Sequence, residues 1–323
     1  MSAGAVGGPV PGAGRVRLIL LLVVIGAGWG LTEPLSKIAV DGGYQPLGLI
    51  FWQLVIASVA LGLVCLLRGR LPRITPRRLG LWAVIALVGT ILPNGVSYRA
   101  LAHLPSGVMS ILISMVPMFA FPIALALGND RFSLTRIAGL CLGLGGVVLI
   151  VGPEASLPEP AMAAFIPLAL LAPFFYAVEG NLVSRWGTSG MDPVQTLFGA
   201  SVLGMVLVLP ATLASGQWID PRPPWGAADV ALIASSLIHA VIYCGYVWMV
   251  GRAGSVFAAQ VAYLVTSFGM IWAMLILGEA YSGYVWTALA LMLSGLALVQ
   301  PRPALPPVPR PVAGAPCDET RAT

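Results

Sequence analysis

The sequence predicts an all-α polytopic membrane protein in which ten transmembrane helices form two inverted repeats of five. Three observations carry this prediction: ten apolar stretches in succession, basic residues that collect in alternate loops, and an internal repeat of about 148 residues. Only 9% of the residues are charged and 58% are hydrophobic, whereas soluble domains carry roughly 25% charged residues. This composition argues strongly against a soluble enzyme.

Each expected span has about the length that crosses 30 Å of hydrocarbon, which takes roughly 20 apolar residues. Charges, prolines and glycines separate the spans. In the first half the spans are expected at 18–40 (after Arg15 and Arg17), 47–67 (opened by Pro46 and closed by Arg68), 79–98 (after Arg78), 108–127 (before Gly128) and 137–152 (after Arg136). In the second half they are expected at 163–184 (before Arg185), 194–214 (after Pro193), 230–250 (after Asp229), 256–277 (before Gly278) and 285–299 (before Pro301).

The chain ends are expected to lie outside the two repeats, which cover residues 18–153 and 163–299. Residues 1–17 are expected to be a disordered cytoplasmic lead, and residues 300–323 a disordered, Pro-rich cytoplasmic tail. The first apolar stretch lacks an A-x-A cleavage site, so we expect an uncleaved first span. The four cysteines show no C-x-x-C pair, and neither a disulfide framework, a metal site nor a cofactor is expected.

The distribution of arginine predicts the orientation in the membrane. Basic residues in short loops stay on the cytoplasmic side during insertion. With both termini inside, 14 arginines lie in the cytoplasm, and only Arg99 and Arg222 lie outside. We therefore expect a multi-pass protein of the inner (cell) membrane whose net charge of +5 reflects topology, with the lipid bilayer and not nucleic acid as its partner.

The internal repeat relates the two halves. Tyr98 matches Tyr246 and, after a one-residue gap, Asp130 matches Glu279 and Gly146 matches Gly295. Because each repeat holds an odd number of spans, the second copy must insert upside down, as in inverted-repeat secondary transporters, whose site lies at the repeat interface. Asp130 and Glu279 end corresponding spans and are expected to cap or orient helices rather than to contact substrate.

Several segments resemble a known family: GWGLTEPLSK in the first span, Pro46, the stretch from YRALAHLPSG to Pro117, and LGEAYSGYVWTALALMLSGLALV at the end. They are similar to the EamA-type branch of the drug/metabolite transporter superfamily, and the resemblance covers all ten spans. It implies a carrier of amino acids, metabolites or drugs. Family members often carry an arginine early in the second span, where this chain has Trp52 and Gln53.

Charged groups inside a span are costly and are expected to face a cavity or a partner. Glu33 and Lys37, spaced i, i+4 on the first span, share one face and are expected to form an ion pair, although Lys37 also lies near enough to the outer end to reach the headgroups. Glu179 on the sixth span stands at almost the equivalent depth, and the alternative is a pair with Arg185. A carboxyl from each half would serve a proton-coupled carrier.

Uncharged polar and aromatic side chains complete the expected substrate site, although each is equally compatible with a helix-packing or headgroup role. The full set is Trp29, Glu33, Lys37, Asn94, Tyr98, Tyr176, Glu179, Asn181, His239, Tyr243, Gln260 and Tyr263. Glycines such as Gly139, Gly143, Gly145 and Gly146 on the fifth span, with Gly295 on the tenth, are expected to form faces for close helix contact or homodimerisation.

The function expected from these features is secondary active export of a small metabolite, amino acid or drug-like molecule by alternating access, coupled to protons. No nucleotide-binding motif is present in the sequence. An intramembrane enzyme acting on lipid or prenyl groups is the alternative, and it would need a clustered catalytic set. The two histidines, His103 and His239, lie far apart in the sequence.

Overall fold

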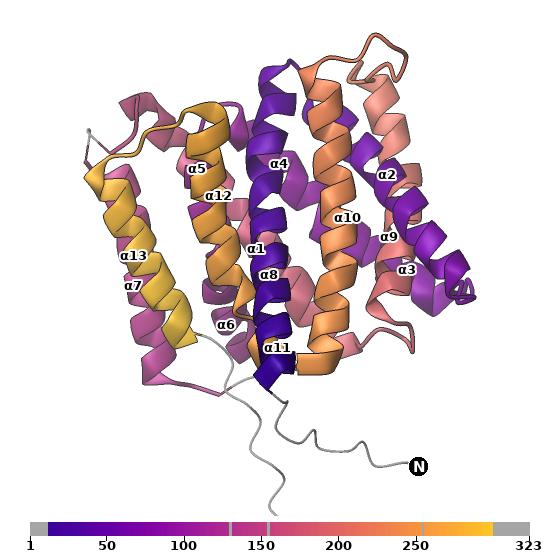
Figure 1. Ribbon diagram of the computed structural model, residues 1–323, viewed down its shortest axis with the longest axis horizontal. Helices are drawn as coiled ribbons and strands as arrows, with labels where there is room; N and C mark the ends of the chain where they lie inside the picture. Colours follow the sequence, from indigo (N-terminus) through magenta and orange to yellow (C-terminus); the bar gives the residue numbers. More distant parts are fainter. Residues whose placement is uncertain (1–11, 129–130, 154–155, 254, 300–323) are drawn as a thin grey trace, which may run out of the picture.

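The computed structural model describes residues 12–128, 131–153, 156–253 and 255–299, and every regular element in these ranges is helical (Figure 1). The helices of the first half are α1 (Gly12–Asp41), α2 (Pro46–Leu67), α3 (Pro76–Ala86), α4 (Leu92–Leu101), α5 (Ser106–Ile113), α6 (Val116–Ala126) and α7 (Leu134–Val151). Those of the second half are α8 (Ile166–Trp186), α9 (Pro193–Ala214), α10 (Ala227–Ala253), α11 (Ser255–Ala258), α12 (Val261–Leu277) and α13 (Gly283–Val299). The predicted all-α membrane fold is thereby confirmed.

Helix length and composition identify eight of the ten expected membrane crossings. Within the described residues, eight helical stretches are long and apolar enough to span a bilayer. Three of them are composite: a π-helical turn, Leu87–Ile91, joins α3 to α4, a short break joins α5 to α6, and a 3-10 turn, Pro160–Phe165, leads into α8. The apolar helices α12 and α13 are shorter, with 17 residues each, which corresponds to about 26 Å of helix.

Sequence signals account for most helix boundaries. Pro46, Pro76 and Pro193 each occupy the first turn of a helix, where a missing N–H costs nothing. Asp192 caps α9 in a reciprocal capping box with Gln195. Gly278 ends α12 with a φ of +68°, a conformation that glycine adopts without strain.

The start of α1 is the main departure from the expected boundaries. The helix begins at Gly12, so residues 12–17 do not belong to a disordered lead. The expected first span starts at residue 18 because the apolar run follows Arg15 and Arg17, and hydropathy does not extend the helix back to Gly12. The rest of the expected lead and the tail 300–323 lie outside the described residues.

Helices from the two halves pack against one another throughout the bundle. In Figure 1, α1 stands between α10 and α12, while α7 lies against α13 at one end of the molecule. On the other side α2 packs on α9, and α8 packs on both α4 and α6. Each major contact therefore joins the first half to the second, which places residues of both halves around the centre.

The contact of α7 with α13 depends on glycine. A Cβ at Gly139 would lie 2.7 Å from the carbonyl oxygen of Gly295, and one at Gly295 would lie 2.6 Å from the carbonyl oxygen of Gly139. A Cβ at Gly145, by contrast, would have its nearest neighbour, Leu291 Cδ1, at 3.9 Å. Gly139 and Gly295 thus allow close helix contact within the chain, which is one of the two roles expected for these glycines. Gly145 was expected in the same face but lies beside the contact.

Two sets of polar contacts attach loops to helices at the end of the bundle opposite the N-terminus. The Glu279 carboxylate accepts hydrogen bonds from the backbone N–H groups of Ser106 (2.7 Å) and Gly107 (3.2 Å) and from the hydroxyl of Tyr281. Glu279 therefore caps α5, as expected, whereas Asp130 lies outside the described residues. Burial and the bond to this carboxylate raise the pKa of Tyr281, which keeps its hydroxyl protonated and donating.

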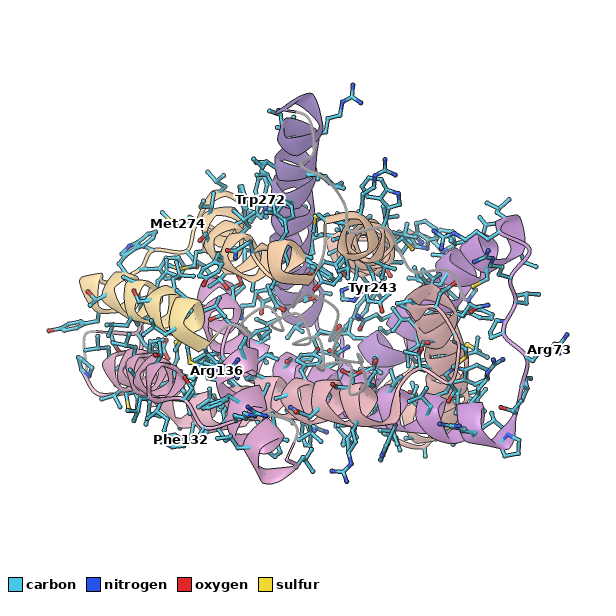
Figure 2. The ribbon with its side chains drawn as sticks, turned by 90° about the horizontal axis from the view of Figure 1, so that it is seen from below. Arg73, Phe132, Arg136, Tyr243, Trp272 and Met274 are labelled. Carbon is cyan, nitrogen blue, oxygen red and sulfur yellow. The ribbon has the colours of Figure 1, made fainter. Side chains whose placement is uncertain are left out.

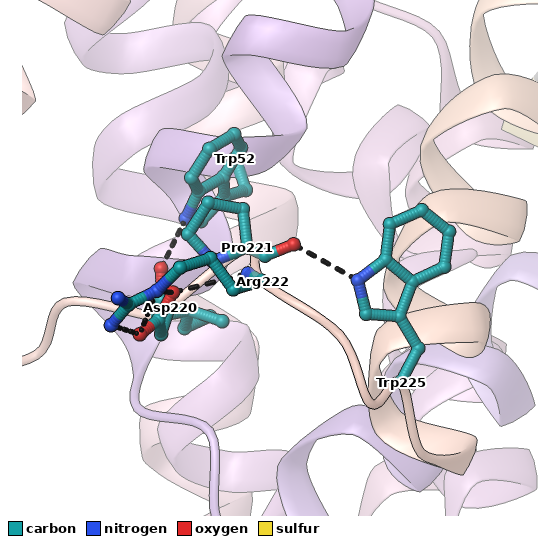
Figure 3. Close-up of polar contacts among 6 residues, drawn as sticks. Trp52, Asp220, Pro221, Arg222 and Trp225 are labelled. Atoms are coloured by element: carbon teal, nitrogen blue, oxygen red, sulfur yellow. Dashed lines mark hydrogen bonds and ion pairs between the residues drawn. The ribbon is translucent and has the colours of Figure 1, made fainter.

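The second set of polar contacts attaches the loop between α9 and α10 to α2 (Figure 3). The indole N–H of Trp52 donates to the carbonyl oxygen of Ile219 at 3.1 Å, and Trp225 donates to Pro221 O at 2.9 Å. Arg222 forms an ion pair with Asp220, and its bonds lower the pKa of Asp220 to about 2. Trp52 therefore serves the loop, while its neighbour Gln53 points elsewhere.

Candidate functional site

A chain of side-chain hydrogen bonds links α8, α4 and α2 across the middle of the bundle. The Tyr176 hydroxyl donates to Asn94 Oδ1 at 2.8 Å, and Asn94 Nδ2 donates to Gln53 Oε1 at 3.0 Å. The Tyr98 hydroxyl donates to the same Gln53 oxygen at 2.9 Å. We call these four residues, Gln53, Asn94, Tyr98 and Tyr176, the polar network. The network orients amide and phenol groups within spans where apolar residues predominate.

Two carboxyl groups flank the polar network, one from each half of the chain. Glu33 on α1 lies within electrostatic reach of the hydroxyls of Tyr98 and Tyr176. Glu179 on α8 lies within reach of Tyr176 and of Tyr243 on α10. Tyr176 is therefore common to both carboxyls. Both glutamates keep part of their surface accessible, so they are not sealed in apolar packing.

Glu179 rests against the π-helical turn of the third span. A Cβ at Gly89, in the middle of that turn, would lie 3.0 Å from Glu179 Cγ. A larger residue at this position would require the Glu179 side chain to shift by a few tenths of an ångström. π-Helical turns of this kind insert one extra residue and occur often at functional sites. Gly89 and the turn were not identified from the sequence.

A second group of side chains joins α1 to α10. Trp29 Nε1 donates to His239 Nδ1 at 3.2 Å, and the rings of Trp29 and Tyr246 lie 5.2 Å apart. Accepting this bond requires Nδ1 of His239 to be unprotonated. The structure thus brings Trp29 and His239 together, and it adds Tyr246 to them.

The expected ion pair between Glu33 and Lys37 is wrong. Lys37 Nζ instead forms an ion pair with Asp41 Oδ1 at 3.0 Å and donates to the carbonyl oxygen of Leu101 at 2.8 Å. Asp41 stands at i+4 from Lys37, so the same helical spacing that favours Glu33 also favours Asp41. Asp41 lies at the end of α1 with a half-exposed side chain, where an ion pair costs less desolvation. Glu33 is left facing the polar network.

The ion pair between Lys37 and Asp41 predicts that substitutions at these two residues have coupled effects on stability. Lys37→Met and Asp41→Asn should be non-additive in thermal unfolding in detergent, with a coupling of about 0.2–1 kcal/mol because the pair is partly exposed. Lys37→Met combined with Glu33→Gln provides the matched control and should show a smaller coupling energy than Lys37→Met combined with Asp41→Asn. Coupling to Glu33 in place of Asp41 would contradict the pairing.

The remaining expected site residues differ in how they lie. Asn181 is buried and donates to the carbonyl oxygens of Ala120 (3.1 Å) and Ala177 (2.9 Å), so it joins α8 to α6 and not to the polar network. Gln260 precedes the first turn of α12, and Tyr263 lies one turn further along, half-buried. The alternative partner of Glu179, Arg185, donates instead to the carbonyl oxygen of Leu127 at 3.1 Å.

Gln53 is the residue that the sequence analysis missed. It was noted only as standing near the place of a family arginine, yet it accepts two of the three hydrogen bonds of the polar network. The signal available in the sequence was an amide side chain inside an apolar span, since buried polar groups require partners.

The comparisons with known proteins agree with this architecture. A probable terminal-alkyne amino-acid exporter of Streptantibioticus cattleyicolor is 25% identical over 299 residues, covering 88% of this chain and 94% of that protein. A WAT1-related protein of Arabidopsis thaliana is 25% identical over 141 residues, 43% of this chain and 39% of its own length. One crystal structure shares the fold at a TM-score of 0.60 and 18% identity, covering 88% of this chain and 96% of that one.

The family model of the EamA-like transporters matches the chain twice, over residues 16–152 and 164–300. Together the two matches take in nearly all of the described helices and both carboxyls that flank the polar network. The chain therefore belongs to the EamA-like transporter family.

Proposed function

We propose that this protein is a secondary active exporter that moves a small amino acid or similar metabolite by alternating access, coupled to protons. The observation that carries the proposal is the polar network with Glu33 and Glu179 on either side of it, one carboxyl from each half. A carboxyl can bind a proton or a cationic substrate group in turn, which is the exchange that a proton-coupled carrier performs. The amino-acid class is suggested by the exporter of Streptantibioticus cattleyicolor.

Two hydrogen bonds support an inverted arrangement of the halves. Trp29 on α1 bonds to His239 on α10, and Tyr176 on α8 bonds to Asn94 on α4. Residue 176 lies 147 positions after 29, and 239 lies 145 after 94, close to the repeat. Exchanging the two halves therefore places the Trp29–His239 bond at the position of the Tyr176–Asn94 bond. Such pairs are expected where a pseudo-two-fold axis runs through a central site.

The proposal includes ten crossings, with α12 and α13 as the ninth and tenth. Their 17 residues reach the lower limit of spanning length. An even number of crossings leaves both termini on one side, and the arginine distribution assigns that side to the cytoplasm. An intramembrane enzyme is the less favoured alternative, because the family and the named exporter are both associated with transport.

Transport in proteoliposomes tests the proposal. L-propargylglycine, a short terminal-alkyne amino acid, serves as the probe alongside its saturated analogue L-norvaline. An imposed pH gradient should drive net transport without nucleotide, and Glu33→Gln or Glu179→Gln should reduce the gradient-driven rate by at least about tenfold, as loss of a proton-transferring group does. Exchange of substrate for substrate should persist, since it need not include the proton step.

Glu159→Gln, on an exposed loop, makes the same chemical change away from the polar network and should keep the wild-type response. Net transport that ignores the pH gradient, together with wild-type rates in both glutamate variants, would overturn proton coupling. Failure of the wild-type protein to transport either amino acid would overturn the substrate class.

A further inference from the structure

A pocket of about 450 Å³ lies where the ends of α2, α9 and α10 meet, and five residues line it: Arg68, Arg70, Asp192, Val247 and Trp248. We call it the Arg68 pocket. The arginines follow the last turn of α2, Asp192 caps α9, and the two apolar residues belong to the last two turns of α10. Its volume falls within the range of small-molecule sites, roughly 300–1,000 Å³.

Gln195 connects the Arg70 backbone and the Asp192 carboxylate of the Arg68 pocket. Gln195 Nε2 donates to the carbonyl oxygen of Arg70 at 2.8 Å, which ties the loop of the arginines to the start of α9. Gln195 N–H donates to Asp192 Oδ1 at 2.9 Å. Asp192 Oδ2 takes no part in this capping box, so one carboxylate oxygen remains for a ligand. A site for an anion thus stands beside a site for a cation.

The third wall of the pocket is apolar. Val247 and Trp248 supply it, and 51% of the Trp248 side chain is exposed. The guanidinium of Arg252 lies 5.5 Å from the centre of the Trp248 ring, a distance that suits a cation–π contact. The indole thus places an apolar surface beside the charged residues of the pocket.

Tyr243 on α10 lies within electrostatic reach of both the Arg68 pocket and the carboxyl group beside the polar network. Tyr243 precedes Val247 by one helical turn, so the two share a face of the helix. The Tyr243 hydroxyl lies within electrostatic reach of both Asp192, in the pocket, and Glu179, beside the polar network. Figure 2, seen from the end of the bundle near the N-terminus, shows Tyr243 on the inner side of α10. One tyrosine therefore stands between the two sites.

We infer that the Arg68 pocket is a loading site for a zwitterionic α-amino acid with a short apolar side chain. The ammonium group binds Asp192, the carboxylate binds Arg68 and Arg70, and the side chain packs on Val247 and Trp248. From there the amino acid passes Tyr243 to reach Glu179. The inference rests on the proposed function, because it presumes export from this side of the membrane.

Initial rates of transport, measured with substrate supplied on the side of the Arg68 pocket, test the inference. Asp192→Asn removes the charge but keeps the α9 cap, since asparagine caps as well as aspartate does. It should raise KM for L-norvaline about fivefold at little change in kcat, as expected for a half-exposed ion contact near 1 kcal/mol. Inhibition by pentanoate, which lacks the ammonium group, should be unchanged in this variant.

The double variant Arg68→Gln with Arg70→Gln should change inhibition by the carboxylate probe and not by the amine probe. KM for L-norvaline should again rise about fivefold, inhibition by pentanoate should weaken, and inhibition by n-butylamine should be unchanged. Arg73→Gln with Arg77→Gln, in the same loop but outside the pocket, makes the same charge change and should keep KM within about twofold. Thermal unfolding in detergent verifies that each variant is folded.

Wild-type KM in both pocket variants, with transport intact, overturns the loading site and leaves the exporter standing. A KM change that depends on anionic lipid in the vesicles and not on the charges of the probe also overturns it, in favour of a lipid headgroup in the pocket. A wild-type protein that carries no amino acid would overturn the substrate class of the proposed function and the loading site with it.

Discussion

Gln53→Leu is expected to reduce transport at least about tenfold in protein that still folds. The leucine leaves Asn94 and Tyr98 without their shared acceptor, and each unsatisfied buried polar group costs about 1–3 kcal/mol. Both side chains should then turn to other partners, which dissolves the polar network between the carboxyls. The measurement is the initial transport rate per amount of folded protein in proteoliposomes.

Gln45→Leu provides the matched control, because Gln45 is exposed just before α2 and its side chain makes no capping bond. Adding Tyr98→Phe to Gln53→Leu should cost less than Tyr98→Phe alone in the wild type, since its acceptor has already gone. Wild-type rates in Gln53→Leu would show that the polar network serves packing and not transport.

Gly139→Ala is expected to destabilise the bundle by about 1–3 kcal/mol, the usual cost of overpacking. The new methyl would meet Gly295 O at 2.7 Å and Val299 Cγ2 at 2.6 Å, and a backbone carbonyl cannot move aside without separating α7 from α13. The midpoint of thermal unfolding in detergent should fall, by roughly 2–4 °C per kcal/mol in proteins of moderate size.

Gly145→Ala lies on the same helix, and its new methyl would have its nearest neighbour, Leu291 Cδ1, at an ordinary contact distance of 3.9 Å. It should be neutral, or stabilising by up to about 1 kcal/mol through helix propensity. Equal destabilisation by both substitutions would mean that the α7–α13 contact does not depend on the close approach at Gly139.

The fold was predictable from the sequence because lipid requires nearly every residue of a span to be apolar. The expected bounds of α2, α9 and α13 agree with the structure within two residues. Hydropathy does not respond to backbone irregularities, however. The π-helical turn at Leu87–Ile91 and the break between α11 and α12 depend on packing with other helices, so neither was expected.

The candidate site was predictable in its residue types but only partly in its contacts. Periodicity placed Glu33 and Lys37 on one face, yet the same periodicity also admits Asp41, and exposure at the helix end decided the pairing. The contacts of Gln53 and Asn181 depend on which neighbouring helix each one faces. A single sequence contains no such distance information. For this reason Gln53 was not expected in the site, and Asn181 was assigned to the centre.

The π-helical turn has a consequence for the energetics of a two-state carrier. With identical halves, the inward-open and outward-open forms would be related by the two-fold rotation and equal in free energy. The third span contains the turn, whereas its counterpart α10 is continuous from Ala227 to Ala253. Glu179 therefore rests on a feature for which Glu33 has no equivalent. Under the proposed cycle, this asymmetry gives the empty carrier a preferred side on which to wait, and the populations of the two forms follow from the free-energy difference.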